Sequence, residues 1–182
     1  MAGGLRPGRK KGRVCREGFL ILVVTGSGGY SFRRFLDTID EMAPRFDLPF
    51  VIQDGPDPYP ARNCRTIGLV AYERLMEFYR DATLVVSHTS SGPLIYAKKF
   101  RKPIITLPRR PELGEAVDDH QVETAEALKP IDEAMRITLM GVEEIEPAIR
   151  TVLEGLGKGM QYSSGAEELL RLQNAIRSAC LE

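Results

Sequence analysis

The sequence predicts an α/β fold in which a mostly parallel sheet carries helices on both faces. Short apolar runs of strand length alternate along the chain with segments whose apolar residues recur at helical spacing. The links between these segments are short, and repeated strand–helix units with short links build parallel sheets that are covered on both sides. With 182 residues, the chain is long enough to bury one substantial core.

The first half of the chain contains three predicted strands and two predicted helices. Residues 19–24 are continuously apolar, as in a buried strand, and the helical pattern after them stops at Pro44. Closely spaced prolines then predict a rigid loop. The predicted order is strand 19–24, helix 31–42, strand 49–53, proline-rich loop 54–60, strand 66–70 and helix 72–79.

The second half repeats the alternation. A β-branched run stops at Ser87 and a helical pattern follows the small residues after it, while Asp118 is a suitable N-cap for a later helix. The predicted order is strand 83–87, a helix from near Ser91, strand 103–107, helix 118–128, strand 135–139, helix 142–153, a glycine-rich hinge 155–165 and an amphipathic helix 166–180. We therefore expect a flexible basic arm over residues 1–17, one domain over 18–154, and the hinge and last helix over 155–182.

Charge and cysteine content limit the classes of function. Six of the 25 basic residues precede the first acidic residue, Glu17, so 19 basic residues remain against 25 acidic ones, a net charge of −6. Such an acidic body suits nucleic-acid binding poorly, because that binding neutralises phosphates. Cys15, Cys64 and Cys180 are scattered, which argues against a disulfide framework and a zinc site and fits a reducing cytoplasm. The sequence shows neither a secretory signal nor an apolar run long enough for a membrane span.

Three polar segments follow predicted strands, and ligands of parallel sheets bind at the carboxyl ends of strands. They are the glycine loop 25–31, the turn His88-Thr89-Ser90-Ser91-Gly92, and the segment 109–121. The turn opens a helix, whose free N–H groups and positive dipole end suit a phosphate or diphosphate. Ser90 and Ser91 can cap the helix or donate hydroxyls, and Gly92 permits a close approach to the backbone. An ordinary capped strand–helix turn would have the same pattern.

The other two segments also have structural alternatives. Arg109 can meet phosphate or be an exposed charge, and His88 at a strand end can be a ligand contact or a structural histidine. His120 has acids beside it and could be a general base, although Asp118 and Asp119 also suit a helix start.

The glycine loop permits a dinucleotide interpretation as well. Gly26-x-Gly28-x-x-Ser31 is one residue short of the dinucleotide fingerprint, and Asp54 follows the second predicted strand. A nicotinamide-type oxidoreductase therefore stays a weak alternative. The absence of Gly-Lys-Ser/Thr excludes a P-loop, and no Asp-x-Asp pair suggests a metal on a diphosphate.

Five segments, in order, resemble the C-terminal donor-binding domain of family 28 glycosyltransferases. Residues 114–121 (Gly-Glu-Ala-Val-Asp-Asp-His-Gln) are the most specific match. Residues 87–93 (Ser-His-Thr-Ser-Ser-Gly-Pro) stand where relatives have Ser-His-Ala-Gly-Ala-Gly-Thr, and Arg101-Lys102-Pro103 where they have Gly-Lys-Pro. The similarity is closest to small members, such as catalytic subunits of two-subunit N-acetylglucosaminyltransferases and bacterial exopolysaccharide transferase subunits. The five segments are 24–35, 51–60, 79–94, 102–109 and 114–128.

The resemblance implies a Rossmann-like half of a GT-B fold that binds a UDP-sugar without a metal or other cofactor. It implies an inverting transfer, of N-acetylglucosamine or a related hexose, to a lipid-linked saccharide acceptor at the cytoplasmic membrane face. A membrane-anchored, acceptor-binding subunit would be the partner. We expect the last helix, 166–180, to dock on that subunit, although it could also fold back on its own sheet or form a homodimer.

By position, the resemblance assigns donor-binding roles but no catalytic base. Tyr96 stands where relatives usually have a Glu that holds both ribose hydroxyls. This departure leaves open a different grip on the ribose, a different donor, or a non-catalytic subunit that only binds a nucleotide sugar or a partner. The assigned residues are Ser90, Ser91 and Gly92 at the phosphates, Gly26, Ser27, Gly28 and Gly29 near the sugar cleft, and Asp119, His120 and Gln121 at the sugar hydroxyls, with His88, Thr89 and Arg109 as further donor contacts.

Overall fold

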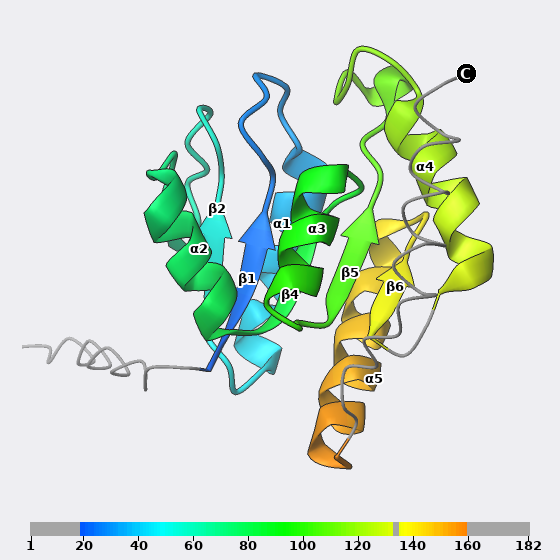
Figure 1. Ribbon diagram of the computed structural model, residues 1–182. Coiled ribbons are helices and arrows are strands. Elements are labelled where there is room, and N and C mark those ends of the chain that lie inside the picture. The colour runs from blue at the N-terminus through cyan, green and yellow to red at the C-terminus, as the bar shows by residue number, and fades with distance from the viewer. Residues whose placement is uncertain (1–18, 133–134, 160–182) are drawn as a thin grey trace, which may run out of the picture.

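The computed structural model describes residues 19–132 and 135–159, in which six strands form one sheet between two layers of helices (Figure 1). The described strands are β1 Leu20–Val24, β2 Phe50–Gln53, β3 Arg65–Thr66, β4 Ala82–His88, β5 Ile104–Leu107 and β6 Arg136–Thr138. The longer helices are α1 Arg33–Met42, α2 Tyr72–Asp81, α3 Ser91–Lys99, α4 His120–Leu128 and α5 Ile145–Gly157. The predicted basic arm 1–17 and the predicted helix 166–180 lie outside the described residues.

The sheet has the order β3-β2-β1-β4-β5-β6, and every neighbouring pair is parallel. The chain first builds outwards from β1 to β3 and then returns to add β4 on the other side of β1. This reversal creates a switch point between β1 and β4, where the loops after the two strands separate to opposite sides. The predicted parallel α/β class is thus confirmed.

The two helical layers have separate cores. Helices α1 and α5 pack on one face of the sheet, and α2, α3 and α4 pack on the other (Figure 1). In α1 the helical spacing brings Phe35, Leu36, Ile39 and Met42 onto the face that meets the sheet, and all four are buried. Each such side chain stabilises the fold by about 1.5–3 kcal/mol, so the spacing that predicts the helix also fixes its orientation.

The third strand differs from the prediction of residues 66–70, because β3 consists only of Arg65 and Thr66 at the sheet edge. Gly68 follows with a positive φ of 62°, and its N–H donates to Oδ1 of Asp54 at 2.8 Å. This turn leads the chain away from the sheet, so the apolar residues after it are free to line another surface.

Helix α5 also extends further than predicted. It runs to Gly157 and therefore includes Gly155, at which the hinge was expected to begin. Apolar residues beyond Leu153 still pack on the α1–α5 core, since Leu156 contacts it. In the described part of the chain, no helix is long and apolar enough to cross a membrane.

Candidate functional site

The carboxyl ends of four strands lie side by side at one edge of the sheet, which is the upper edge in Figure 1. Val24 at the end of β1 is in register with Gln53 on β2 and Ser87 on β4, and His88 is in register with Leu107 on β5. The loops that follow these strands therefore converge at the switch point. A cavity of about 530 Å³ lies between them, within the usual size of small-molecule sites.

All three predicted polar segments contribute to this cavity, but not with every predicted residue. The cavity is lined by Gly26, Ser27, Gly28, His88, Ser90, Gly92, Arg109 and Gln121. The structure does not bring the other five into it, namely Gly29, Thr89, Ser91, Asp119 and His120.

Gly26 forms the floor of the cavity and tolerates no side chain. Its φ is +86°, and a Cβ there would lie 3.0 Å from Cε1 of His88. The carboxamide of Gln53 fixes this loop from below, because Oε1 accepts from Gly26 N at 3.1 Å and Nε2 donates to Gly26 O at 3.0 Å. Gly55 is equally constrained, since a Cβ there would lie 2.7 Å from Gly26 O. The glycines therefore let two loops and a histidine ring stack closely at the switch point.

His88 lies beneath this loop and is only 8% exposed. Burial lowers its pKa to about 4, against a smaller raising effect of its contact with the carbonyl of Val24. Nδ1 is 3.3 Å from Val24 O, and because a carbonyl only accepts, this nitrogen carries the proton in the hydrogen bond. The ring is therefore neutral at pH 7, with Nε2 left as an acceptor at the cavity floor.

We expect His88 to make the fold sensitive to acid. Between pH 6.5 and pH 4 the unfolded chain binds a proton at this position that the folded chain does not, so stability falls as the pH falls. A pKa lowered from 6.5 to about 4 corresponds to about 3 kcal/mol lost over this range. Urea unfolding at several pH values should show this loss of stability in the wild type. In His88→Gln, the fall in the free energy of unfolding between pH 6.5 and pH 4 should be smaller by about 3 kcal/mol.

The only other histidine provides a matched control for this prediction. His120 is exposed, and His120→Gln should leave the pH dependence of the wild type in place. Identical pH profiles for the wild type and His88→Gln would contradict the assignment.

The N-terminus of α3 opens onto the cavity beside the floor. Ser90 is the N-cap residue, with extended backbone and a hydroxyl that makes no capping hydrogen bond. The N–H groups of Ser91 and Gly92 belong to the first turn and have no intrahelical acceptor, whereas Pro93 has no N–H. The backbone N–H of Gly92, the free hydroxyl of Ser90 and the positive end of the helix dipole thus lie at a site of suitable size for an anionic group.

Arg109 joins two of the loops rather than presenting its charge freely. It is 6% exposed, and its guanidinium donates to the carbonyls of Thr25 at 2.9 Å, Tyr30 at 2.8 Å, Glu115 at 3.2 Å and Ser31 at 3.3 Å. Burial lowers its pKa, while the nearby Glu115 carboxylate opposes that shift. These four bonds start from Nη1 and Nη2 and hold the glycine loop against the segment after β5, and the phosphate contact predicted for Arg109 stays a prediction.

The segment after β5 is fixed by two further contacts. The buried carboxylate of Glu115 accepts from Nε and Nη2 of Arg34 at 2.8 and 3.0 Å, and from the N–H of Arg110 at 3.0 Å. Gln121 lies in the first turn of α4, and its Oε1 accepts from Arg109 N at 3.1 Å. This orients the carboxamide, so Nε2 of Gln121 is the group that could meet a ligand.

Asp119 and His120 lie outside the cavity at the start of α4. Both are exposed, and the ring of His120 is 3.3 Å from Glu123 Oε2 and 3.7 Å from Asp118 Oδ2. Helix α4 begins at His120 with Asp119 as its N-cap residue, so the prediction of Asp118 as N-cap is wrong by one position, although Asp118 Oδ1 accepts from the N–H of His120 at 3.3 Å. These acids and the histidine therefore interact with one another at the rim, and only Asp118 among them lines the cavity.

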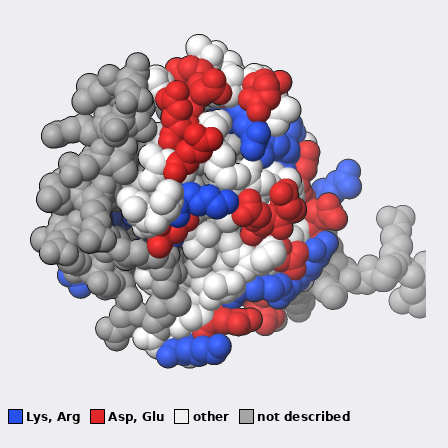
Figure 2. Space-filling view, turned by 90° about the vertical axis from the view of Figure 1, so that its right-hand side faces the viewer, with Lys and Arg blue, Asp and Glu red and all other residues white. Residues whose placement is uncertain are grey.

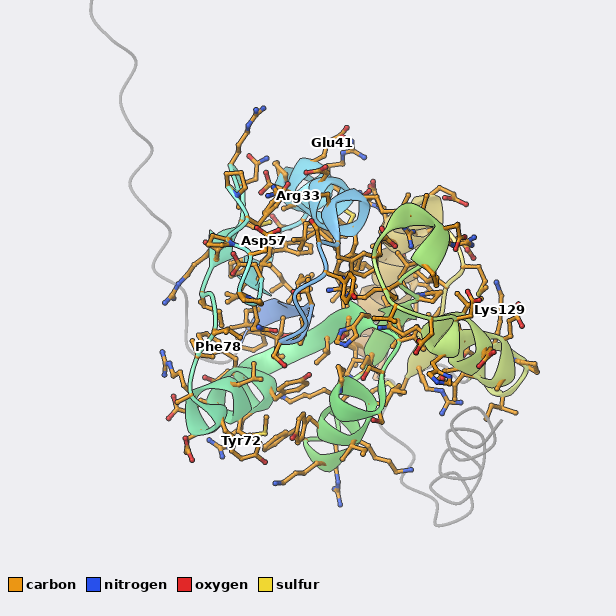
Figure 3. All side chains as sticks on the ribbon, turned by 90° about the horizontal axis from the view of Figure 1, so that it is seen from above. Arg33, Glu41, Asp57, Tyr72, Phe78 and Lys129 are labelled. Atoms are coloured by element: carbon orange, nitrogen blue, oxygen red, sulfur yellow. The ribbon has the colours of Figure 1, made fainter. Side chains whose placement is uncertain are left out.

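Sequence reasoning singled out Tyr96 but missed the other residues on the apolar side of the site. Leu69, Val70, Leu75, Tyr79 and Tyr96 form one wall, here called the apolar wall. Leu69 and Val70 fell within the predicted strand 66–70, and the predicted helix 72–79 carried no site assignment for Leu75 or Tyr79. In the view from above, Tyr72 lies on the α2–α3 side of the sheet, and Arg33 lies on the opposite side with α1 (Figure 3).

The surface charges of the described residues on the α4–α5 side form no extended patch of a single sign that would indicate a charged macromolecular ligand (Figure 2). On the α4–α5 side, basic and acidic side chains are interspersed, with acidic ones prominent near the upper end (Figure 2). No cluster of three or more His, Cys, Asp or Glu that could hold a metal ion occurs in residues 19–132 and 135–159. The cavity is lined by the glycine loop, the start of α3, the segment after β5 and the apolar wall.

This architecture is a Rossmann-like half of the GT-B glycosyltransferase fold. ALG13 aligns with a TM-score of 0.58 over 90% of this chain and 98% of its own, at 10% sequence identity. The spinosyn forosaminyltransferase SpnP aligns with a TM-score of 0.55 over 90% of this chain and 41% of its own, at 15% identity. A UGT transferase from Siraitia grosvenorii, solved in complex with UDP, aligns with a TM-score of 0.51 over 91% and 44%, at 18% identity.

The likeness lies in the fold. The chain spans nearly the whole of ALG13 but less than half of the two longer transferases. No protein-family model and no curated protein sequence matches it. The resemblance to a glycosyltransferase donor-binding domain that the motifs predicted is confirmed at the level of architecture.

Proposed function

We propose that this chain is the donor-binding, catalytic half of a glycosyltransferase that uses a nucleoside diphosphate sugar, with UDP-sugars as the type that the sequence resemblance implies. The observation that carries the proposal is the cavity of about 530 Å³ at the β1–β4 switch of a GT-B-like half. In open parallel sheets this is the position where nucleotides bind.

Three parts of the cavity lining suit the three chemical parts of such a donor. The diphosphate suits the N-terminus of α3, with the N–H group of Gly92 and the hydroxyl of Ser90. The sugar suits the side that carries Gln121, whose Nε2 can donate to a hydroxyl. The nucleoside suits the apolar wall, because aromatic and aliphatic side chains bury a base favourably.

The same arrangement can support an inverting transfer without a metal ion. Charge develops on the diphosphate as the bond to the sugar breaks, and preorganised N–H groups stabilise such charge in the transition state. The dipole of α3 acts in the same direction. Arg109 would contribute by keeping the glycine loop in place through its bonds to Tyr30 and Thr25.

We further propose that the acceptor is a lipid-linked saccharide and that a membrane-anchored partner supplies the acceptor-binding half. The chain spans 41% and 44% of the two longer transferases with the same fold. The catalytic base would then come from the partner or from the acceptor side of the cleft, because His88 is buried beneath the glycine loop.

The position of Asp54 argues against the oxidoreductase alternative. Its two carboxylate oxygens accept from the N–H groups of Tyr59 and Gly68, both at 2.8 Å. It does not line the cavity. A nicotinamide site needs an acidic residue at the ribose hydroxyls after the second strand, and the residue at that place is committed to the loop instead.

Titration calorimetry with the full chain tests the proposed function. We expect UDP to bind, uridine without phosphates to bind more weakly, and NAD not to bind. UDP at a hundredfold excess over its Kd should raise the free energy of unfolding by about 2.7 kcal/mol. Tighter binding of NAD than of UDP would overturn the proposal in favour of the oxidoreductase.

A further inference from the structure

Tyr96 is the side chain that α3 contributes to the apolar wall, and its ring is held by other aromatic residues. It makes edge contacts with Tyr79 at 5.5 Å and with Tyr72 at 5.9 Å between ring centroids. Tyr79 is itself 1% exposed and stacks on Phe100 at 6.4 Å. Such edge-to-face pairs are individually favourable, so the phenol of Tyr96 has a defined place in the cavity.

The geometry of α3 places this phenol beside the pentose of a bound nucleotide. Gly92 and Tyr96 are four residues apart and both line the cavity, so they lie on one helix face about 6 Å apart along the axis. The pentose directly follows the diphosphate in a nucleotide. A diphosphate at Gly92 therefore brings the pentose to Tyr96 and the base further along the apolar wall.

The side chains at that position can serve one pentose hydroxyl but not two. The phenol of Tyr96 is one donor and acceptor, and its hydroxyl makes no hydrogen bond within the described residues. The side chains of Leu69, Val70 and Leu75 in the apolar wall offer only carbon. The two carboxylates that line the cavity, Glu115 and Asp118, belong to the segment after β5, on the other side of the switch point, and that of Glu115 is already paired with Arg34.

We propose that the donor carries a 2′-deoxyribonucleoside diphosphate rather than a ribonucleoside diphosphate, an inference that rests on the proposed function. A 2′-deoxy pentose presents its 3′-hydroxyl to Tyr96 and a CH₂ group to the apolar wall. In a ribonucleotide the 2′-hydroxyl would lose water without gaining a side-chain acceptor, and an unpaired buried polar group is costly. Tyr96 is thus the residue that determines specificity for the pentose.

Calorimetry with dUDP and UDP tests this assignment, because the two nucleotides differ in one oxygen atom. We expect dUDP to bind the wild type about tenfold more tightly than UDP, since one unpaired buried hydroxyl costs about that factor. Tyr96→Glu should reverse the preference, because a carboxylate accepts from both hydroxyls of ribose. Tyr96→Phe, which keeps the aromatic contacts, should retain the preference for dUDP with weaker binding of both nucleotides.

The outcomes separate this inference from the proposed function. Binding of UDP as tight as or tighter than that of dUDP to the wild type would overturn the deoxynucleotide assignment and leave the proposed function standing. Binding of neither nucleotide would overturn both. If Tyr96→Glu does not fold, the wild type and Tyr96→Phe still decide the question.

Discussion

Replacement of Gly92 by Asp is expected to abolish nucleotide binding and leave the fold intact. Gly92 lines the cavity in the first turn of α3, and a Cβ added there meets no atom within 4 Å, so the new side chain has room. Its carboxylate would lie where the diphosphate binds. Two like charges about 4 Å apart repel by about 4 kcal/mol at an effective dielectric constant of 20, so we expect the Kd for UDP to rise at least about a hundredfold.

Two controls separate the effect of the charge from other causes. Gly92→Asn adds a side chain of similar size without charge and should weaken binding much less. Thr151→Asp adds the same charge on the exposed surface of α5 and should leave binding unchanged. An acidic residue in the first turn of a helix is itself favourable, so the melting temperature of Gly92→Asp should not fall. Retention of UDP affinity by this folded variant would show that the diphosphate binds elsewhere.

The fold could be predicted because its strands and helices are determined by local patterns. β1, β2, β4 and β5 are buried on both faces, and the continuous apolar runs that this burial requires are visible in the sequence. The edge strand β3 could not be predicted in the same way. Arg65 and Thr66 are both exposed, so they carry no apolar pattern, and the turn at Gly68 depends on a hydrogen bond that its N–H donates to the distant carboxylate of Asp54.

The site was predictable to the extent that its residues follow strand ends. The parallel topology brings every such loop to one edge of the sheet, so the glycine loop, the start of α3 and the segment after β5 converge as expected. The direction of a side chain depends instead on tertiary contacts. Arg109 turns towards three carbonyls of the glycine loop, and Tyr96 is positioned by aromatic residues of α2, neither of which a local pattern reveals.

Arg109→Leu is expected to destabilise the protein by about 3–5 kcal/mol, the range found when one partner of a buried charged network is removed. The carbonyl oxygens of Thr25, Tyr30, Ser31 and Glu115 would lose a charged donor together, and each buried group left unpaired carries its own desolvation cost. The guanidinium also lies 4.6 Å from the ring centroid of Phe32, a cation–π contact that leucine does not make. Urea unfolding at pH 7 should show this loss as a lower midpoint with a similar slope.

Substitution of the neighbouring Arg110 provides the control for this prediction. The side chain of Arg110 is 34% exposed, and it bonds Met140 O and the exposed Glu112 rather than the glycine loop. Arg110→Leu should therefore cost about 1 kcal/mol or less, since exposed ion pairs stabilise little. Arg109→Lys should fall between the two, because one ammonium group cannot reach four carbonyls that a planar guanidinium serves together. If Arg109→Leu were as stable as Arg110→Leu, the glycine loop would be held by Gln53 and His88 alone, and Arg109 would be free to act on the donor.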